Sequence, residues 1–255
     1  MVVRNNRYYQ GHPVEWAEDI LGVRLWSMQK DILEALVDSS VVVKSGHGMG
    51  KDFLGGVAIL WFLCCFKDSK VITTAPSARQ VEKVIWGEVG RLYHQSRKPL
   101  GGKLMSQELR MSPSWYAIGF TTRETNSTVG KAQGFHAPHQ LVVITEAQAV
   151  DEGIYEQLDG VLTSNHSRKY IAGNPLMSQG HFWRIFNDSK VGNEYKKFTF
   201  SCFDAPNVKE RRDIFPGMVS YDWVEACRTK WGTESPLWEG RVLGEFPRVS
   251  VQTLL

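Results

Sequence analysis

Short apolar runs alternate with longer segments of helical periodicity along most of the chain. Runs of strand length occupy positions 41–43, 70–74, 141–144 and 169–172. Between them, apolar residues are continuous or recur every three to four positions, as they do in helices that pack on a core. Helices are therefore expected at 53–66, 78–94 and 150–162. Strands that alternate with helices predict an α/β domain, and a chain of 255 residues can form one large domain of this kind.

The segments outside this alternation have other patterns. Residues 104–111 and 115–120 alternate loosely on either side of Pro113, which predicts an antiparallel pair of strands. A further strand is expected at 195–202, and further helices are expected at 14–21, 25–36, 182–186, 221–230 and 236–243. Polar and turn-rich stretches at 121–135 and 204–216 are expected to be loops.

The first apolar run leads into a glycine-rich loop, SGHGMGKD, at positions 45–52. Glycines let the backbone turn tightly and aim successive N–H groups at an anion, and the helix that follows places its positive end at the same point. Lys51 is expected to reach the β- and γ-phosphates of a nucleotide. The expected nucleotide-binding residues of the loop are Ser45, Gly46, His47, Gly48, Met49, Gly50, Lys51 and Asp52. The alternative is a glycine-rich turn without a ligand, but the strand, the lysine and the helix together favour a nucleotide site.

Polar residues next to other predicted elements are candidates for the same site. Glu146 follows the strand at 141–144, where open α/β sheets bind ligands, and it is the natural general base for an attacking water. Asn174 follows the strand at 169–172 and is placed to sense the γ-phosphate; the alternative is an ordinary turn asparagine before proline. Gln29 heads the helix before the strand that leads into the glycine-rich loop, where it is either a ligand for an adenine edge or a solvated glutamine.

Composition narrows the class of protein only in part. The net charge of +3 neither shows nor excludes a nucleic-acid partner. The four cysteines have no metal-ligand spacing and form no disulfide framework, as expected for reduced thiols in a cytosolic protein. The N-terminal segment lacks the apolar core of a signal peptide, and the apolar run at 58–66 is too short to cross a membrane. We therefore expect a soluble intracellular protein without a membrane partner.

With these motifs in place, the chain resembles the ATPase domain of the large terminase subunit of tailed bacteriophages, a viral DNA-packaging motor. The resemblance covers nearly the whole chain and rests on the order of Gln29, SGHGMGKD, TAPSARQV, AQGFHAPHQLVVITEAQAV, AGNP and GEFP. It implies a mainly parallel central sheet flanked by helices, in a P-loop NTPase of the additional-strand, catalytic-glutamate type. It also implies a domain at 1–247, followed at 248–255 by the start of a linker to a C-terminal nuclease domain that is not in the sequence. On this expectation, the chain is a truncated large subunit or an isolated ATPase domain.

The resemblance also implies an activity and partners. ATP is the substrate, Mg²⁺ is the cofactor, and hydrolysis drives double-stranded DNA into a procapsid in the host cell cytoplasm. Lys51 and Glu146 are the implied catalytic residues, and Asn174 belongs to the implied coupling motif. The implied partners are the portal protein, the small terminase subunit and further copies of the chain in a ring, and the isolated domain is expected to be a monomer.

Several positions depart from the pattern of that family. Asp52 stands where a Thr or Ser follows the P-loop lysine, and Thr145 stands where an Asp precedes the catalytic Glu. One hydroxyl and one carboxylate are still present, so we expect both residues to serve as metal ligands with their roles exchanged. His47 and Gln133 replace arginines that many relatives carry, and Lys131 or Arg123 are substitutes for the second of these, a trans-acting arginine finger. The departures also motivate an alternative function, a degenerate nucleotide- and DNA-binding module with weak or no hydrolysis.

Overall fold

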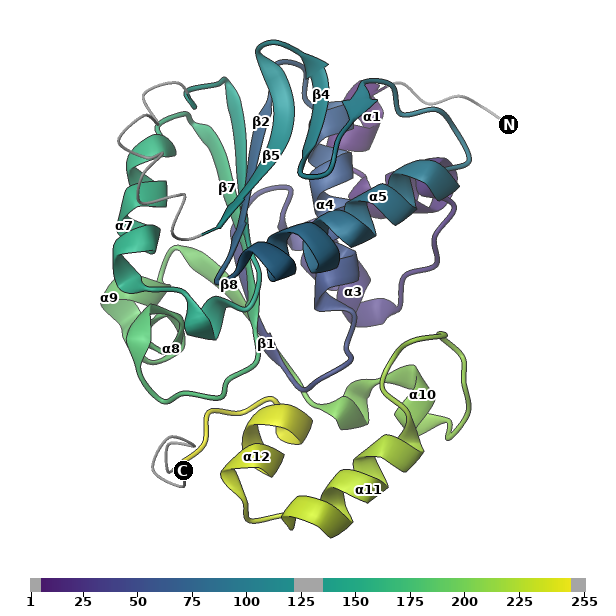
Figure 1. Cartoon of the computed structure of the whole chain (residues 1–255), viewed down its shortest axis with the longest axis vertical. Coiled ribbons are helices and arrows are strands. Elements are labelled where there is room, and N and C mark those ends of the chain that lie inside the picture. The colour runs from purple at the N-terminus through teal and green to yellow at the C-terminus, as the bar shows by residue number, and fades with distance from the viewer. Residues whose placement is uncertain (1–5, 122–134, 249–255) are drawn as a thin grey trace. The chain divides into compact units, whose positions relative to one another are not determined.

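The computed structural model describes residues 6–121 and 135–248, and the chain in it divides into two compact units (Figure 1). The first unit comprises Met1–Val41, Asp52–Thr145 and Val150–Ile171. The second unit comprises Val42–Lys51, Glu146–Ala149 and Ala172–Leu255. The P-loop and Glu146 therefore belong to the second unit, together with the C-terminal third of the chain.

The strands form one sheet in the order β3-β4-β5-β2-β6-β7-β1-β8. Their bounds are β1 Ser40–Ser45, β2 Lys70–Ala75, β3 Lys103–Leu104, β4 Glu108–Ser112, β5 Trp115–Thr121, β6 His139–Ile144, β7 His166–Gly173 and β8 Tyr195–Phe200. β2 pairs in parallel with β5 and β6, and β6 pairs in parallel with β7. β4 is antiparallel to β5, as the pattern on either side of Pro113 predicts, and it is also antiparallel to β3. The predicted mainly parallel sheet flanked by helices is confirmed.

Helices cover both faces of the sheet in the first unit (Figure 1). The helical segments of this unit are α1 Asn6–Gln10, α2 Pro13–Trp16, η1 Ala17–Leu21, α3 Ser27–Ala35, α4 Lys51–Cys65, η2 Gln80–Ile85, α5 Trp86–Gln95 and α7 Glu152–Val161. Phe62 of α4 packs on His166, with 5.5 Å between the ring centres. Gln140, whose side chain lies on the opposite face from that of its neighbour His139, donates a hydrogen bond of 2.8 Å to the Val161 carbonyl of α7. The apolar run predicted as a helix at 53–66 is thus α4, which lies in the core.

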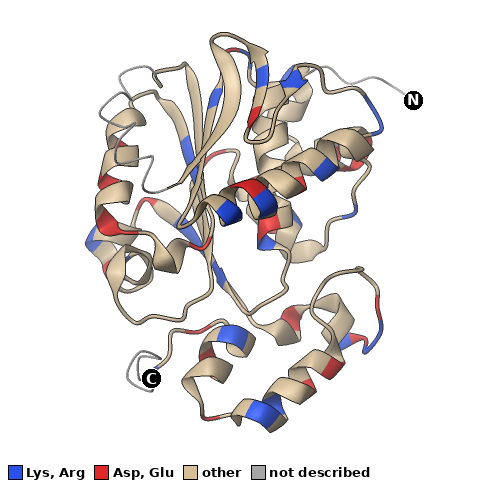
Figure 2. Ribbon diagram, in the orientation of Figure 1, with Lys and Arg blue, Asp and Glu red and all other residues tan. Residues whose placement is uncertain are grey.

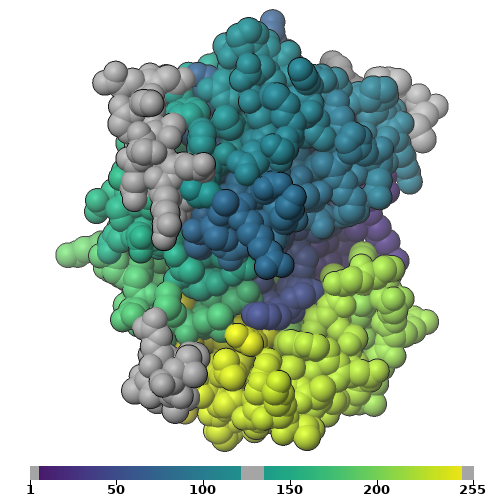
Figure 3. Space-filling model, viewed as in Figure 1, coloured from purple at the N-terminus to yellow at the C-terminus, as the bar shows by residue number. Residues whose placement is uncertain are grey.

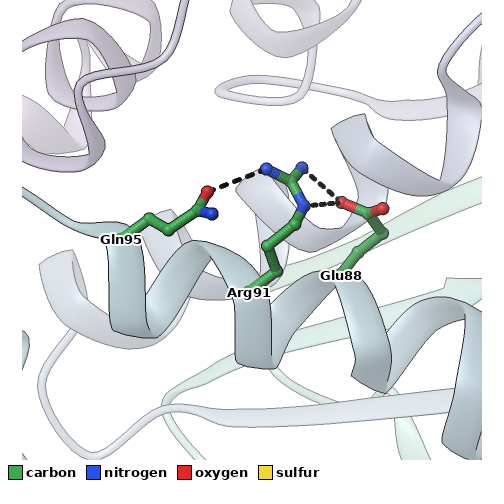
Figure 4. Close-up of polar contacts among 3 residues, drawn as sticks. All are labelled: Glu88, Arg91 and Gln95. Atoms are coloured by element: carbon green, nitrogen blue, oxygen red, sulfur yellow. Dashed lines mark hydrogen bonds and ion pairs between the residues drawn. The ribbon is translucent and has the colours of Figure 1, made fainter. Parts of the chain in front are cut away.

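The outer face of α5, unlike the buried helix α4, carries charged and polar side chains. Arg91 donates two hydrogen bonds to one oxygen of Glu88, at 3.2 and 2.6 Å, and one to Gln95 at 3.0 Å (Figure 4). Such pairs, three and four residues apart, stabilise an exposed helical face. Basic and acidic residues both occur along this helix (Figure 2), and α5 forms one continuous surface of the first unit with the nearby β3–β4 hairpin (Figure 3).

The second unit adds short helical segments after β7. They are η4 Ala147–Ala149, α8 Gly180–Asn187, α9 Ser189–Gly192, η5 Cys202–Asp204, α10 Pro206–Lys209, α11 Tyr221–Trp231, α12 Pro236–Trp238 and η6 Glu239–Leu243. The predicted helices at 221–230 and 236–243 are confirmed, and Ser220 and Ser235 cap them by accepting N–H bonds of 3.2 Å from Trp223 and Trp238.

The prediction that residues 204–216 form only a loop is wrong, because this stretch contains α10 and the end of η5. Pro206 begins α10, and the buried amide of Asn207 fixes the chain that follows. Its Oδ1 accepts bonds from the N–H groups of Ile214 and Phe215, at 2.9 and 2.8 Å.

Among the described residues, no helix has the length and apolarity needed to span a membrane.

Candidate nucleotide site

The P-loop joins the end of β1 to the start of α4, as the sequence predicts. Gly48 and Gly50 adopt φ values of 67° and 79°, a left-handed conformation that glycine reaches without steric strain. At Gly46 the limit is space, since a Cβ would lie 2.5 Å from the Cys202 sulfur and 2.8 Å from the Val242 carbonyl oxygen. The glycines of this loop therefore answer separate physical requirements of one backbone path.

Several segments of the second unit hold the loop in place. The Gly46 N–H donates to the Phe200 carbonyl at 3.0 Å, and the His47 N–H donates to the Arg241 carbonyl at 2.8 Å. On the other side, the Gly48 carbonyl accepts a bond of 2.9 Å from the Val219 N–H. Because the first two N–H groups are used inside the protein, a phosphate would have to be bound by the N–H groups from Gly48 onward.

The GEFP motif, at positions 244–247, contacts the P-loop and the strand that leads into it. Gly244 has a φ of 69°, and a Cβ there would lie 2.3 Å from the Phe200 carbonyl oxygen and 2.8 Å from the Gly46 nitrogen. The next residue, Glu245, forms an ion pair with Lys44 of β1. The motif thus needs a glycine for close approach and a glutamate for the charge of Lys44.

The two lysines near the loop have different surroundings. Lys44 is only 6% exposed, and its ammonium group lies between Glu245 and the rings of Phe186 and Phe246, whose centres are 5.5 and 5.3 Å away. Lys51 instead folds back over the loop, and its Nζ donates to the Ser45 hydroxyl at 3.0 Å and to the Gly46 carbonyl at 3.2 Å. Lys51 is therefore the lysine whose ammonium group lies on the loop itself.

A chain of hydrogen bonds connects Glu146 to the P-loop. Gln148 donates from Nε2 to Oε2 of Glu146 at 2.6 Å. Its Oε1 accepts the Asn174 N–H at 3.1 Å, and the Asn174 amide donates from Nδ2 to the Ser45 carbonyl at 2.6 Å. Each of these residues lies in the second unit. Glu146 and Asn174, which the sequence predicts as site residues, are thus brought together with the loop, and Gln148 is the link between them.

The backbone of Glu146 is strained. Its φ is 51°, a left-handed value that costs a residue with a side chain roughly 1–2 kcal/mol. Strain of this kind persists only where the surroundings hold it, and it is concentrated at functional sites. The turn between β6 and η4 therefore fixes the direction in which the carboxylate leaves the chain.

His47 is held as a neutral ring. Burial lowers its pKa to about 4, and the charges of Lys51 and Arg241 act in the same direction against an opposing effect of Glu146. The ring stacks on Trp223 of α11, with centres 6.3 Å apart and planes within 11°. The residue that stands where the resemblance implies an arginine therefore carries no charge near neutral pH.

Comparisons with known proteins concern the fold that carries this site. No protein-family profile matches the chain. The chain is 24% identical over 235 residues to the probable terminase large subunit of Enterobacteria phage P7, which covers 88% of this chain and 46% of that protein. A mutant of the ATPase domain of the Thermus phage P74-26 large terminase has a TM-score of 0.67 to the chain at 16% identity, over 91% of this chain and 98% of that one. The chain has the fold of a large terminase ATPase domain.

A second solved terminase extends the comparison to nucleotide complexes. This large terminase, from a thermophilic bacteriophage, has a TM-score of 0.64 at 12% identity, over 96% of this chain and 54% of that one. That protein has also been solved with ADP and with ATP-gamma-S, with TM-scores of 0.60 and 0.61. The chain spans about half the length of the P7 protein. The resemblance predicted from the motifs is confirmed, at the level of a terminase ATPase fold.

The expected metal ligands of this terminase fold lie in the first unit. Thr145 is 1% exposed, and its hydroxyl has no hydrogen-bond partner among the described residues. Asp52 lies in the first turn of α4, and its charge adds to the effect of burial in raising the pKa of Tyr170. Among the described residues, His, Cys, Asp and Glu nowhere gather in threes as a metal site. Mg²⁺ needs few protein ligands when phosphates and waters supply the rest, so an orphaned buried hydroxyl fits it.

The remaining predicted residues are less informative. Gln29 is 4% exposed, and its Oε1 accepts the Trp26 N–H at 3.4 Å, which caps the first turn of α3. A solvated glutamine is thereby excluded, while its role toward adenine stays a prediction. Arg123, Lys131 and Gln133, the positions considered for an arginine finger, lie outside the described residues.

Proposed function

We propose that this chain is a Mg²⁺-dependent ATPase that drives double-stranded DNA into a viral procapsid. The observation that carries the proposal is the hydrogen-bonded path from Glu146 through Gln148 and Asn174 to the P-loop. It links a carboxylate suited to activating water with a loop suited to binding phosphate. The terminase fold and the named relatives support the same proposal.

Each residue of the path has a defined task in this proposal. The N–H groups of the loop from Gly48 onward bind phosphate oxygens, and Lys51 neutralises charge on the β- and γ-phosphates. Glu146 accepts a proton from the attacking water, for which it needs a fixed direction and a basic oxygen. Asn174 contacts both the loop and Gln148, and it therefore couples the state of the phosphates to the position of the carboxylate.

Steady-state hydrolysis of ATP, with and without double-stranded DNA, tests the proposal. We expect Lys51→Ala to abolish turnover and weaken ATP binding. Lys44→Ala, which breaks the ion pair with Glu245, should lower the stability of the fold more than the rate of ATP hydrolysis. Glu146→Gln keeps its ATP affinity and loses about 10²-fold or more in rate, the usual loss for a missing general base. Turnover of Glu146→Gln near the wild-type rate would remove this residue from the mechanism.

A second function is favoured by the two altered positions at the metal. Asp52 and Thr145 would each supply one oxygen to Mg²⁺, which when bound neutralises phosphate charge. If they do not, the chain is a degenerate module that binds nucleotide and DNA and hydrolyses poorly. ATP binding without any turnover that DNA or Mg²⁺ can stimulate would establish this second function.

A double-mutant cycle separates exchanged ligands from a dead site. Asp52→Thr alone leaves two hydroxyls, and Thr145→Asp alone leaves two carboxylates, whereas the double variant restores one of each in the usual order. We expect both single variants to hydrolyse ATP more slowly and the double variant to recover. Simply additive effects, or activation by Thr145→Asp alone, would show that the roles have not been exchanged.

The proposed assembly follows from the motor activity. The motor works in the host cytoplasm as a ring of copies on the portal protein, with the small terminase subunit and double-stranded DNA as partners. A finger from a neighbouring copy contributes about 10³–10⁵ in rate in comparable enzymes, so the isolated chain is expected to be a slow, monomeric ATPase. Fast turnover in a sample shown to be monomeric by light scattering would contradict this assembly.

A further inference from the structure

Arg241 of η6 lies against the P-loop, and the sequence motifs do not single it out. Its backbone carbonyl accepts the His47 N–H at 2.8 Å. The same carbonyl oxygen and that of Val242 would lie 3.0 and 2.8 Å from a Cβ at Gly46. The start of the loop is therefore in van der Waals contact with the backbone that carries the arginine.

The side chain of Arg241 lies against one ring of an aromatic cluster made of His47, Trp223 and Trp231. Its guanidinium carbon lies 5.6 Å from the ring centre of Trp231. Trp231 meets Trp223 edge to face at 6.0 Å, and Trp223 stacks on His47. Stacking on an aromatic ring directs a guanidinium without neutralising it. Arg241 is thus a cation held beside the loop with its charge intact.

The guanidinium of Arg241 keeps one unused hydrogen-bond donor within the described part of the chain. The Nε of Arg241 is buried without a hydrogen-bond partner among the described residues. Burying a hydrogen-bond donor without a partner is unfavourable, so such groups in native proteins await a water, an ion or a ligand. An anion is the ligand that suits a guanidinium best.

The charges that act on the His47 ring indicate which part of a nucleotide Arg241 would contact. Lys51 and Arg241 both disfavour protonation of this ring, and Glu146 favours it, so the charges of all three groups act on the same side chain. Glu146 marks the position of the attacking water in the proposed reaction, and the water attacks the terminal phosphate. Arg241, whose carbonyl accepts the His47 N–H of the same loop, is therefore assigned to the γ-phosphate end of the nucleotide.

We propose that Arg241 is a phosphate-binding residue that acts within its own chain and contacts the γ-phosphate of ATP. This inference rests on the proposed function, since it assumes that the P-loop binds ATP. It assigns a cation to the terminal phosphate in the second unit itself, independently of any finger from a neighbouring copy.

The test is the affinity for ATP and for ADP, measured by displacement of a fluorescent nucleotide from the full chain in Mg²⁺. Arg241→Gln is expected to weaken ATP binding about tenfold or more and ADP binding less than about threefold, since one charge-assisted contact is lost only with ATP. Arg241→Lys keeps the charge and should recover part of the ATP affinity. The matched control is Arg228→Gln, which removes a guanidinium stacked 5.7 Å from Trp238 and leaves His47 untouched.

The outcomes separate this inference from the proposed function. Equal weakening of ATP and ADP, or wild-type affinity for both, would show that Arg241 only packs on Trp231. A wild-type chain that binds neither nucleotide would remove the proposed function and this inference with it. Weaker ATP binding in Lys51→Ala together with wild-type affinities in Arg241→Gln would leave the proposed function and overturn the inference. Partial unfolding of a variant lowers the amplitude of displacement but not the affinity ratio of the folded fraction, so the ratio stays decisive.

Discussion

Replacing Gln148 with alanine removes both bonds that connect Glu146 to the P-loop path. The lost bonds are the 2.6 Å contact with the Glu146 carboxylate and the 3.1 Å contact with the Asn174 N–H. A hydrogen bond to a charged group contributes about 1.5–3 kcal/mol, and a neutral one about 0.5–1.5 kcal/mol. Because Gln148 is only half-buried, the lower part of these ranges applies.

The two bonds affect different quantities. Loss of about 2 kcal/mol of carboxylate positioning in the transition state lowers kcat about 30-fold. Loss of the neutral bond lowers the free energy of unfolding by about 1 kcal/mol. ATP affinity should stay within about twofold of wild type, because these two bonds of Gln148 reach Glu146 and Asn174 rather than residues 45–51 of the loop.

A quenched-flow or coupled assay of ATP hydrolysis measures the first quantity, and urea unfolding measures the second. Gln148→Glu tests the direction of the bond, since a glutamate can accept from Asn174 but cannot donate to Glu146 when ionised. Gln95→Ala, the same change at an exposed residue of α5, is the control and should alter neither quantity. A kcat for Gln148→Ala within about threefold of wild type would refute the reasoning.

Two further predictions concern stability. Glu146→Gly should be about 1 kcal/mol more stable to urea than Glu146→Ala, because glycine adopts a φ of 51° without strain; equal stabilities would mean that the strain is relieved elsewhere. Burial lowers the pKa of His47 and of His166 to about 4, so the unfolded chain binds more protons than the folded one between about pH 4 and 6.5. The contribution of these two neutral rings to the free energy of unfolding is therefore complete above about pH 6.5, and it decreases as the pH falls toward 4. His166→Phe, which keeps the stacking on Phe62, should show a smaller loss by urea unfolding, and an unchanged pH slope would contradict this.

The parts of the fold that could be predicted from the sequence share a physical cause. The strand β6 and the helix α4 are apolar along most of their length, because β6 is buried on both faces and most residues of α4 are buried. The length of each apolar run is therefore enough to predict the element. The short helices α1, α9 and α10 escaped prediction because they span four or five residues, too few for any repeat to be visible.

The site could be predicted only where a local motif carries the chemistry. Lys51 begins the helix after the glycine-rich loop and Glu146 follows the strand β6, so their positions follow from order along the chain. Gln148 and Arg241 depend on contacts with segments 26 and 194 residues away from them, Asn174 and His47, and no local pattern contains such contacts. A signal was present for Gln148, a side chain with donor and acceptor two residues after a proposed base, but it had no meaning until its partners were known.

The strain at Glu146 and the path to the P-loop belong to one argument. A residue with a φ of 51° keeps that conformation only while other contacts hold it, and the bond from Gln148 is the contact that holds its side chain. Gln148 is in turn placed by the Asn174 N–H, and Asn174 is placed by the Ser45 carbonyl. A shift of the loop on binding phosphate would thus move the partner of Asn174 first and the carboxylate last. This gives the coupling role proposed for Asn174 a physical basis, because Asn174 contacts both the loop and the residue that holds the base.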